Sequence, residues 1–193
     1  MLSLTQRHQT IVALLLALLM LATRGHHEIS PVHLPDASWA IFFLAGLYLR
    51  PGWLFAGFFL LAAGMDYVAI TWGGVSSFCV TGAYLFLIPA YGALWFAGRS
   101  YNSSTDLSHR DLLPLALFAL GGTILCEMIS SGGFYFFSGR FVDTSMGEFV
   151  GRLVSYLPGN LFNQALYLGL AALVHGLFSL LRRKEDGSGI RIG

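Results

Sequence analysis

The stretch WLFAGFFLLAAGMDYVAI, residues 53–70, is the part of the sequence that most directly indicates the fold. It is an apolar run close to the ~20 residues that a helix needs to cross the core of a bilayer. Its only charged residue is Asp66, which stands near the C-terminal end of the run. A run of this length and composition predicts a membrane-spanning helix with a carboxylate near one membrane face.

Five further apolar runs flank this segment, at residues 11–22, 37–49, 75–97, 112–129 and 157–181. The first two are short, so they either borrow flanking residues, with Arg7, Arg24 and Arg50 reaching back to the interface, or include a re-entrant segment. The first run also has the length of a signal-peptide core. The residues after it form a poor cleavage site, however, and this favours a retained helix.

Together, the six runs predict an all-α membrane protein with a single domain. We expect one bundle of six transmembrane helices within residues 1–181 and a basic, disordered cytoplasmic tail over residues 182–193. Because proline is tolerated in the first turn of a helix, Pro158 is expected at the start of the last span. The aromatic and charged segment 130–155 is expected to form a long outer connection between the last two spans.

The composition supports a membrane environment and excludes several functions. Of the 193 residues, 55% are hydrophobic and 11% are charged, whereas a soluble domain carries about 25% charged residues. The net charge of +1 gives no indication of a nucleic-acid partner. Lys184 is the only lysine and follows no glycine pattern, so the chain has no P-loop for nucleotide phosphates. The sequence also lacks a His-Glu-x-x-His metalloprotease motif and a Cys-x-x-Cys pair.

Arginine and lysine concentrate on the cytoplasmic side of membrane proteins, and this rule predicts the orientation. With six spans and an internal N-terminus, eight of these residues fall in inner segments and three in outer segments. The inner ones are Arg7, Arg50, Arg99, Arg110, Arg182, Arg183, Lys184 and Arg191, and the outer ones are Arg24, Arg140 and Arg152. We therefore expect both termini in the cytoplasm of a bacterium.

This topology places most of the reactive side chains near the outer, periplasmic face. Asp66 and Glu127 lie near the outer ends of the third and fifth spans. A carboxylate within a span costs about 2.5–3.5 kcal/mol, so it is either functional or compensated. The structural alternative for both acids is an interfacial carboxylate that bonds to the backbone or pairs with Arg140 or Arg152. His27, in the first outer loop, is either a metal ligand or a solvated side chain.

Cys79 is the strongest candidate for metal-binding chemistry. It follows GGVSSF, residues 73–78, in which Ser76 and Ser77 are good helix-capping residues. We expect Cys79 in the first turn of a helix, where the helix dipole favours a thiolate, and a thiolate is a soft metal ligand. The alternative is a small buried hydrophobic residue. Cys126, near the end of its predicted helix, is the weaker candidate.

The pattern of six spans with reactive groups at the outer face resembles the substrate-binding S-components of energy-coupling-factor (ECF) vitamin transporters. The likeness is greatest at AGMDY (residues 63–67), GGVSSFC (residues 73–79) and Tyr84, which resemble the BtuM family of small bacterial cobalamin (vitamin B12) transporters. The resemblance implies uptake of cobalamin across the inner membrane without a dedicated energising module. Ala13 and Ala17 resemble the pair by which S-components dock onto their transmembrane partner, so the chain is either solitary or still able to use such a partner.

The resemblance also implies roles for particular residues. In that family a cysteine at the place of Cys79 is the axial ligand of the cobalt in cobalamin. Asp66 and Tyr84 resemble the pocket residues beside it, and His27 and Arg152 match with less distinctive motifs. Because a thiolate donates strongly to cobalt, binding through Cys79 is expected to loosen or remove a ligand on the upper face, such as cyanide.

Two other functions are compatible with parts of the sequence. A membrane thiol–disulfide oxidoreductase would use Cys79 and Cys126, which are expected at the same face, although neither has a Cys-x-x-Cys partner. An intramembrane serine protease would need a serine and a histidine within ~3 Å of each other. His175 is expected ~27 Å from the level of Ser76 and Ser77, so that function is excluded.

Overall fold

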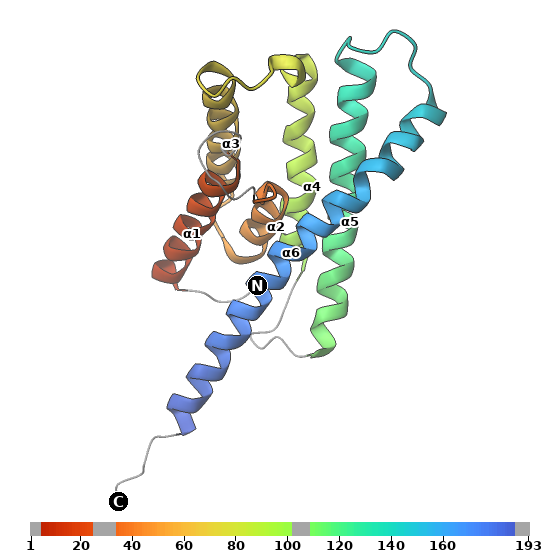
Figure 1. The fold of residues 1–193 in the computed structure, drawn as a ribbon. Helices are drawn as coiled ribbons and strands as arrows, with labels where there is room; N and C mark the ends of the chain where they lie inside the picture. The colour runs from red at the N-terminus through yellow and green to blue at the C-terminus, as the bar shows by residue number, and fades with distance from the viewer. Residues whose placement is uncertain (1–4, 25–33, 102–108, 188–193) are drawn as a thin grey trace, which may run out of the picture.

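The computed structural model describes residues 5–24, 34–101 and 109–187 (Figure 1). Helices dominate these ranges, and no strand occurs in them. The α-helices are α1 (Gln6–Arg24), α2 (Ser38–Tyr48), α3 (Trp53–Thr71), α4 (Leu87–Ser100), α5 (His109–Phe137) and α6 (Met146–Gly187). Two 3-10 helices, η1 (Ser77–Cys79) and η2 (Gly82–Phe86), fill most of the connection between α3 and α4. The prediction of an all-α protein is therefore confirmed.

Three of these helices are long and apolar enough to cross a membrane: α1, α3 and the Leu112–Phe137 part of α5. Large apolar side chains on their surfaces face outward, as Leu14 (60% exposed), Trp53 (72%) and Leu60 (70%) illustrate. Exposed apolar surface on this scale is typical of a protein in contact with lipid. The structure thus supports the prediction of a membrane protein.

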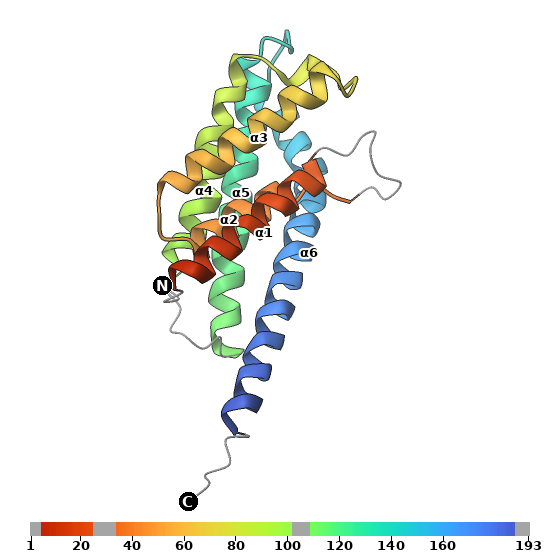
Figure 2. The same cartoon turned by 90° about the vertical axis from the view of Figure 1, so that its left-hand side faces the viewer.

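The prediction of six spans is not confirmed. Helix α2 has 11 residues and α4 has 14, so at 1.5 Å per residue they measure about 16 and 21 Å. Both are shorter than the ~30 Å hydrocarbon core. Helix α2 is instead a core helix, in which Ile41, Phe42 and Phe43 are 0% exposed. Figures 1 and 2 show it inside the bundle, in contact with α1 on one side and α4 on another.

Helices α2 and α4 cross at backbone contact because each provides a glycine. A Cβ atom on Gly46 of α2 would lie 2.0 Å from the carbonyl oxygen of Trp95. One on Gly98 of α4 would lie 2.0 Å from the carbonyl oxygen of Phe43. Small residues allow helices in membranes to approach this closely. The crossing fixes the position of α4, and therefore of η2, relative to the core.

The segment 75–97 is not one helix, contrary to the prediction. It contains η1 and η2, and α4 begins only at Leu87. The side chains of Ser76 and Thr81 each accept a hydrogen bond from the amide two residues on. Each of these caps starts a separate short helix, so the chain turns twice before α4. Cys79 therefore lies in a three-residue 3-10 turn and not in the first turn of a membrane helix.

The connection between α5 and α6 is shorter than predicted. Helix α5 continues to Phe137 and α6 begins at Met146, so only the middle of the segment 130–155 is a loop. The start of α6 is capped by Ser145, whose hydroxyl accepts a hydrogen bond from the amide of Glu148 at 3.2 Å. Serine followed three residues later by glutamate is the capping-box pattern. This cap starts the helix well before the apolar run that indicated it.

Helix α6 extends beyond the predicted last span at both ends. Pro158 was expected in the first turn but lies in the interior of the helix. Because proline has no N–H, it leaves one helix carbonyl there without a donor. The helix continues to Gly187, so part of the segment predicted as a disordered tail is helical. Residues 188–193 lie outside the described ranges. Figure 1 shows the last turns of α6 projecting beyond the other helices.

The two ends of the bundle differ in their polar contacts. The α3–α4 connection and the α5–α6 turn lie at the same end, at the top of Figure 1. At the opposite end, Nη2 of Arg99 donates a hydrogen bond to the carbonyl oxygen of Arg50 at 2.6 Å. These two arginines belong to the set predicted to be cytoplasmic. The first end is where the bundle opens into a polar cavity.

Candidate functional site

A cavity of about 370 Å³ opens among the helices at this end of the bundle. Its walls combine charged, hydroxyl and aromatic side chains from α1, α3, η2, α4, α5 and α6. They are Arg24, Asp66, Ala83, Tyr84, Leu87, Tyr91, Ser130, Ser131, Phe134, Arg152 and Tyr156. Small-molecule sites usually have this form, in which a few convergent polar groups lie in a hollow with apolar walls.

An ion pair between Arg24 and Asp66 lies at the centre of the cavity wall. Nε of Arg24 donates to Oδ1 of Asp66 at 2.7 Å, and Nη2 donates to Oδ2 at 2.8 Å. The Arg24 side chain is 10% exposed and the Asp66 side chain is 26% exposed. From the sequence, Arg140 and Arg152 were the partners considered for Asp66 if it pairs at all. The structure pairs Asp66 with Arg24 instead, because the end of α1 packs beside α3 and the two charges meet there.

Arg24 also connects α1 to α2 and α4. Its Nη1 donates to the hydroxyl of Ser38 at 2.7 Å and to the hydroxyl of Tyr91 at 3.1 Å. The same nitrogen lies 3.4 Å from Oδ2 of Asp36. Asp36 in turn accepts hydrogen bonds from the amide and hydroxyl of Ser38 at the start of α2. Each of the three guanidinium nitrogens therefore has a hydrogen-bond acceptor, which helps to offset the cost of burying the cation.

Tyr84 completes the set of donors around Asp66. Its hydroxyl donates to Oδ2 of Asp66 at 2.8 Å. The side chain is half-buried in η2, and Thr81 caps this short helix at its start. Asp66 thus accepts hydrogen bonds from a cation and from a neutral hydroxyl, and its charge is balanced by Arg24. The result is a nearly neutral polar surface that can exchange hydrogen bonds with a ligand.

Arg152 adds a positive charge on the α6 side of the cavity. The carbon at the centre of its guanidinium lies 4.7 Å from the ring centroid of Phe141, 5.6 Å from that of Tyr135 and 5.8 Å from that of Tyr156. Cation–π contacts of this kind orient the guanidinium without neutralising its charge. Within the described ranges, both ion pairs belong to Arg24, and Arg152 forms none. Its charge therefore remains available to a ligand.

Glu127 lies behind Ser131, which is part of the cavity wall. Its Oε1 accepts a hydrogen bond from the hydroxyl of Ser131 at 2.5 Å, and its Oε2 accepts one from the amide of Asn160 at 2.6 Å. Pairing with Arg140 or Arg152, one of the alternatives drawn from the sequence, is not found among the described residues. Glu127 is 2% exposed and is therefore buried within the protein.

Three of the residues predicted from the sequence share this cavity: Asp66, Tyr84 and Arg152. His27 lies outside the described residues. The backbone of Cys79 belongs to η1, while its side chain is not among those described. Its neighbour Phe78 lies with its ring centroid 5.8 Å from that of Phe134, a residue of the cavity wall. The ring of Phe78 thus joins η1 to the cavity wall, and binding roles for all five residues stay predictions.

The sequence did not reveal Arg24 and Tyr91 as residues of the cavity wall, or Asn160 as the partner of Glu127. Arg24 had a visible signal, since it is an arginine at the end of an apolar run and could balance an acid in another run. Tyr91 and Asn160 had none, because their contribution depends on which helix face turns inward. Cys126, the other thiol, is 0% exposed within α5.

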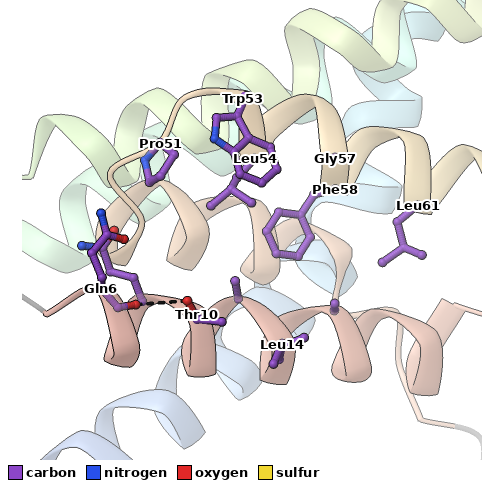
Figure 3. Close-up of a pocket in the computed structure, with 12 residues that line it drawn as sticks. Gln6, Thr10, Leu14, Pro51, Trp53, Leu54, Gly57, Phe58 and Leu61 are labelled. Carbon is purple, nitrogen blue, oxygen red and sulfur yellow. Dashed lines mark hydrogen bonds between the residues drawn. The ribbon is translucent and has the colours of Figure 1, made fainter.

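A second hollow of about 340 Å³ lies between α1 and α3 (Figure 3). Its walls are mostly apolar, and a hydrogen bond of 3.1 Å from the hydroxyl of Thr10 to the carbonyl oxygen of Gln6 lies at one end. Ala13, Ala17 and Gly57 also line it. The small-residue pair singled out in the sequence therefore borders this hollow, and docking of a partner there stays a prediction.

Comparison with known proteins assigns no family. No protein-family model matches the chain, and no curated protein matches its sequence. The fold and the cavity define a class, namely a helical membrane protein with a polar, aromatic-walled cavity at one end of the bundle.

Proposed function

We propose that this protein takes up cobalamin across the bacterial inner membrane and binds it at the periplasmic face. The observation that carries the proposal is the cavity that unites Asp66, Tyr84 and Arg152, with Phe78, the residue before Cys79, in contact with Phe134 of its wall. The first three are residues to which the resemblance to BtuM-type transporters assigns the binding site. The three residues come from α3, η2 and α6. The sequence placed them near one face but did not require them to line one cavity.

The chemistry of the cavity suits a corrinoid. The rim of a corrin ring carries amide side chains, which both donate and accept hydrogen bonds. Asp66 can accept from such amides, and Arg152 can donate to them. Phe134 and Tyr156 offer aromatic surface against which a flat ring can pack. A whole corrinoid is larger than about 370 Å³, so the ring would occupy the cavity in part and extend toward η1.

In this proposal the thiolate of Cys79 is the axial ligand on the lower face of cobalt. It displaces the dimethylbenzimidazole base, since a soft thiolate is a strong donor. Donation from below weakens the bond to an upper ligand such as cyanide. Cyanide then leaves with the electron pair of the cobalt–carbon bond and takes up a proton from solvent, and cobalt keeps its oxidation state. The three-residue η1 gives no helix-dipole support, so the proposal rests on position and ligand softness.

The orientation is part of the proposal: six helices cross or enter the membrane and both termini are cytoplasmic. It is supported by the grouping of charges. Arg24 and Arg152 line the cavity at one end, whereas Arg50 and Arg99 contact each other at the other end. The protein acts alone, as a solitary S-component, or docks a transmembrane partner through the Ala13 and Ala17 surface.

The alternative function is a thiol–disulfide oxidoreductase that uses Cys79 and Cys126. The burial of Cys126 disfavours it, because exchange needs access to the sulfur. Mass measurement of the purified protein after denaturation and alkylation distinguishes the two functions, since the transporter is expected to contain no disulfide between Cys79 and Cys126.

The deciding experiment purifies the protein from cells that are supplied with cobalamin. The unaltered protein is expected to retain a corrinoid and to absorb visible light, and Asp66→Asn is expected to retain less of it. In cells without another corrinoid importer, expression of the protein should restore growth on scarce cobalamin. A colourless protein that also fails to restore growth rules the function out.

A further inference from the structure

Glu127 is a buried carboxylate whose two hydrogen-bond donors are neutral. It is 2% exposed and lies within the Leu112–Phe137 part of α5, which is apolar enough to cross a membrane. Ser131 and Asn160 donate to its two oxygens. Within the described part of the chain, neither ion pair includes Glu127. Because an uncompensated charge is costly in a low dielectric, a cation bound beside this carboxylate would balance it.

Gln164 is a second, independent sign of a missing ligand. Its side chain is 4% exposed, and neither Nε2 nor Oε1 has a hydrogen-bond partner in the described structure. It follows Asn160 by one turn of α6, about 6 Å along the axis and on the same helix face. Asn160 bonds to Glu127 across the α5–α6 interface, so that face is turned toward α5. An ion between the two side chains would bind the carboxylate of Glu127 and Oε1 of Gln164, which otherwise has no partner in the described structure.

We propose that Glu127, Asn160 and Gln164, with the hydroxyl of Ser131, form a Na⁺ site between α5 and α6. Carboxylate, amide-carbonyl and hydroxyl oxygens are hard ligands that suit hard cations. One carboxylate balances one positive charge, so a monovalent ion leaves the site neutral. A divalent ion would leave a net charge in the membrane interior, which is disfavoured. Asn160 presents its carbonyl oxygen to the ion after a half-turn of its amide.

Ser131 connects the ion site to the cavity. Its hydroxyl bonds to Glu127, and the residue also lines the cavity. Binding of the ion changes the hydrogen bond that Ser131 can offer a ligand, and by reciprocity the ligand changes the affinity for the ion. This coupling rests on the proposed uptake function, to which it would supply a driving force. The ion site itself does not depend on that function.

The test measures binding of radioactive sodium to the purified full chain in detergent, in a choline buffer and without corrinoid. We expect saturable binding that unlabelled Na⁺ displaces. Glu127→Gln is expected to abolish it, and Gln164→Leu is expected to weaken the affinity by at least about tenfold. An unaltered protein without saturable Na⁺ binding overturns the proposal, and this result does not depend on the folding of any variant.

Two matched variants control for general effects of substitution. Glu148→Gln removes an exposed carboxylate near the same end of α6, and Asn163→Leu removes the amide next to Gln164. Both are expected to bind Na⁺ within about twofold of the unaltered protein. Equal losses in a variant and its control overturn the assignment of the ligands. Since no corrinoid is present, this result stands whether or not cobalamin proves to be the transported ligand.

Discussion

Arg24 and Asp66 face each other in a two-point pairing, with Nε 2.7 Å from Oδ1 and Nη2 2.8 Å from Oδ2. Parallel hydrogen bonds of this kind are among the strongest that side chains make, and they fix orientation as well as distance. The pair joins the end of α1 to α3 and forms part of the cavity wall. A ligand in the cavity therefore meets two charges that already balance each other.

Asp66→Ala is expected to destabilise the protein by about 3 kcal/mol, because it removes the two-point partner of the buried Arg24 guanidinium and leaves only Asp36, at 3.4 Å, to balance the charge. This value is at the low end of the range of about 3–5 kcal/mol for breaking a buried ion pair, since the Asp66 side chain is 26% exposed. In detergent the thermal unfolding midpoint should fall by roughly 6–12 °C. Asp143→Ala, at an exposed acid in the α5–α6 turn, is the control and should shift the midpoint by less than about 2 °C. Equal shifts would contradict the role of the pair.

Tyr84→Phe removes the hydroxyl that donates to Asp66 and leaves the ring in place. We expect a loss of stability of about 1 kcal/mol and a several-fold weaker affinity for cobalamin, because the carboxylate loses the contact that orients it. Equilibrium titration followed by visible absorbance measures the affinity. Tyr67→Phe, at a tyrosine of α3 that is 65% exposed, should bind as the unaltered protein does. Unchanged affinity in Tyr84→Phe would remove Tyr84 from the binding site.

Gly98→Ala tests the close crossing of α2 and α4. Its methyl group would meet the carbonyl oxygen of Phe43, so the helices must separate, at a cost of about 1–3 kcal/mol. Gly92 lies in the same helix, and a Cβ atom there has nothing within 4 Å. Gly92→Ala should therefore be neutral or stabilising by up to ~1 kcal/mol, as expected for alanine in a helix. Thermal unfolding of both variants decides, and the prediction fails if Gly98→Ala is as stable as Gly92→Ala.

Cys79→Ser tests the proposed bond to cobalt. Serine keeps the size of cysteine but offers a hard oxygen that cobalt binds poorly. The visible spectrum of bound cobalamin should shift, growth on scarce cobalamin should fall, and release of cyanide should stop. Cys126→Ser, at the buried thiol, is the control and should keep the spectrum of the unaltered protein. An unaltered spectrum in Cys79→Ser would mean that this sulfur does not bind cobalt.

Reporter fusions test the orientation. A cytoplasm-active reporter fused after Gly193 is expected to be active, since the positive charges predict a cytoplasmic C-terminus. A periplasm-active reporter inserted at Gly139, in the α5–α6 turn where the backbone has φ +69, is also expected to be active. The reverse pattern at both positions would invert the topology and place the cavity on the cytoplasmic side.

The positions of α2 and α3 were predictable because nearby residues in the sequence determine where these helices begin and end. Residues 37–49 and 53–70 were expected, and the helices are Ser38–Tyr48 and Trp53–Thr71. The turn residues between them, Pro51 and Gly52, interrupt an otherwise apolar segment. The apolar runs and the turn residues were therefore enough to predict these helix boundaries, because no side-chain cap shifts the start of either helix. The length of α2 was predicted well, but its burial by neighbouring helices was not.

The starts of η1, η2 and α6 were not predicted, because polar side chains that cap the backbone determine them. The pattern of Ser145 and Glu148 is readable in the sequence as a capping box, but its position outside an apolar run concealed it. The partner of Asp66 was harder to foresee. Arg24 lies 42 positions away, in a helix whose angle to α3 depends on packing. Local sequence carries no information about the angle at which two helices cross. Asp66 and Glu127 could therefore be identified as unusual acids, but their partners could not.

The length of chain between Arg24 and Asp66 also constrains how the protein is made. The ribosome delivers α1 first, and at ~5–20 residues per second the carboxylate follows about 2–8 s later. Until then Asp36, 12 positions after Arg24, is the acidic partner already made, and the closer two-point pairing with Asp66 forms last. Helix α1 can settle into its final tilt only after α3 has arrived. The ion pair thus makes the final position of the first helix depend on insertion of the third.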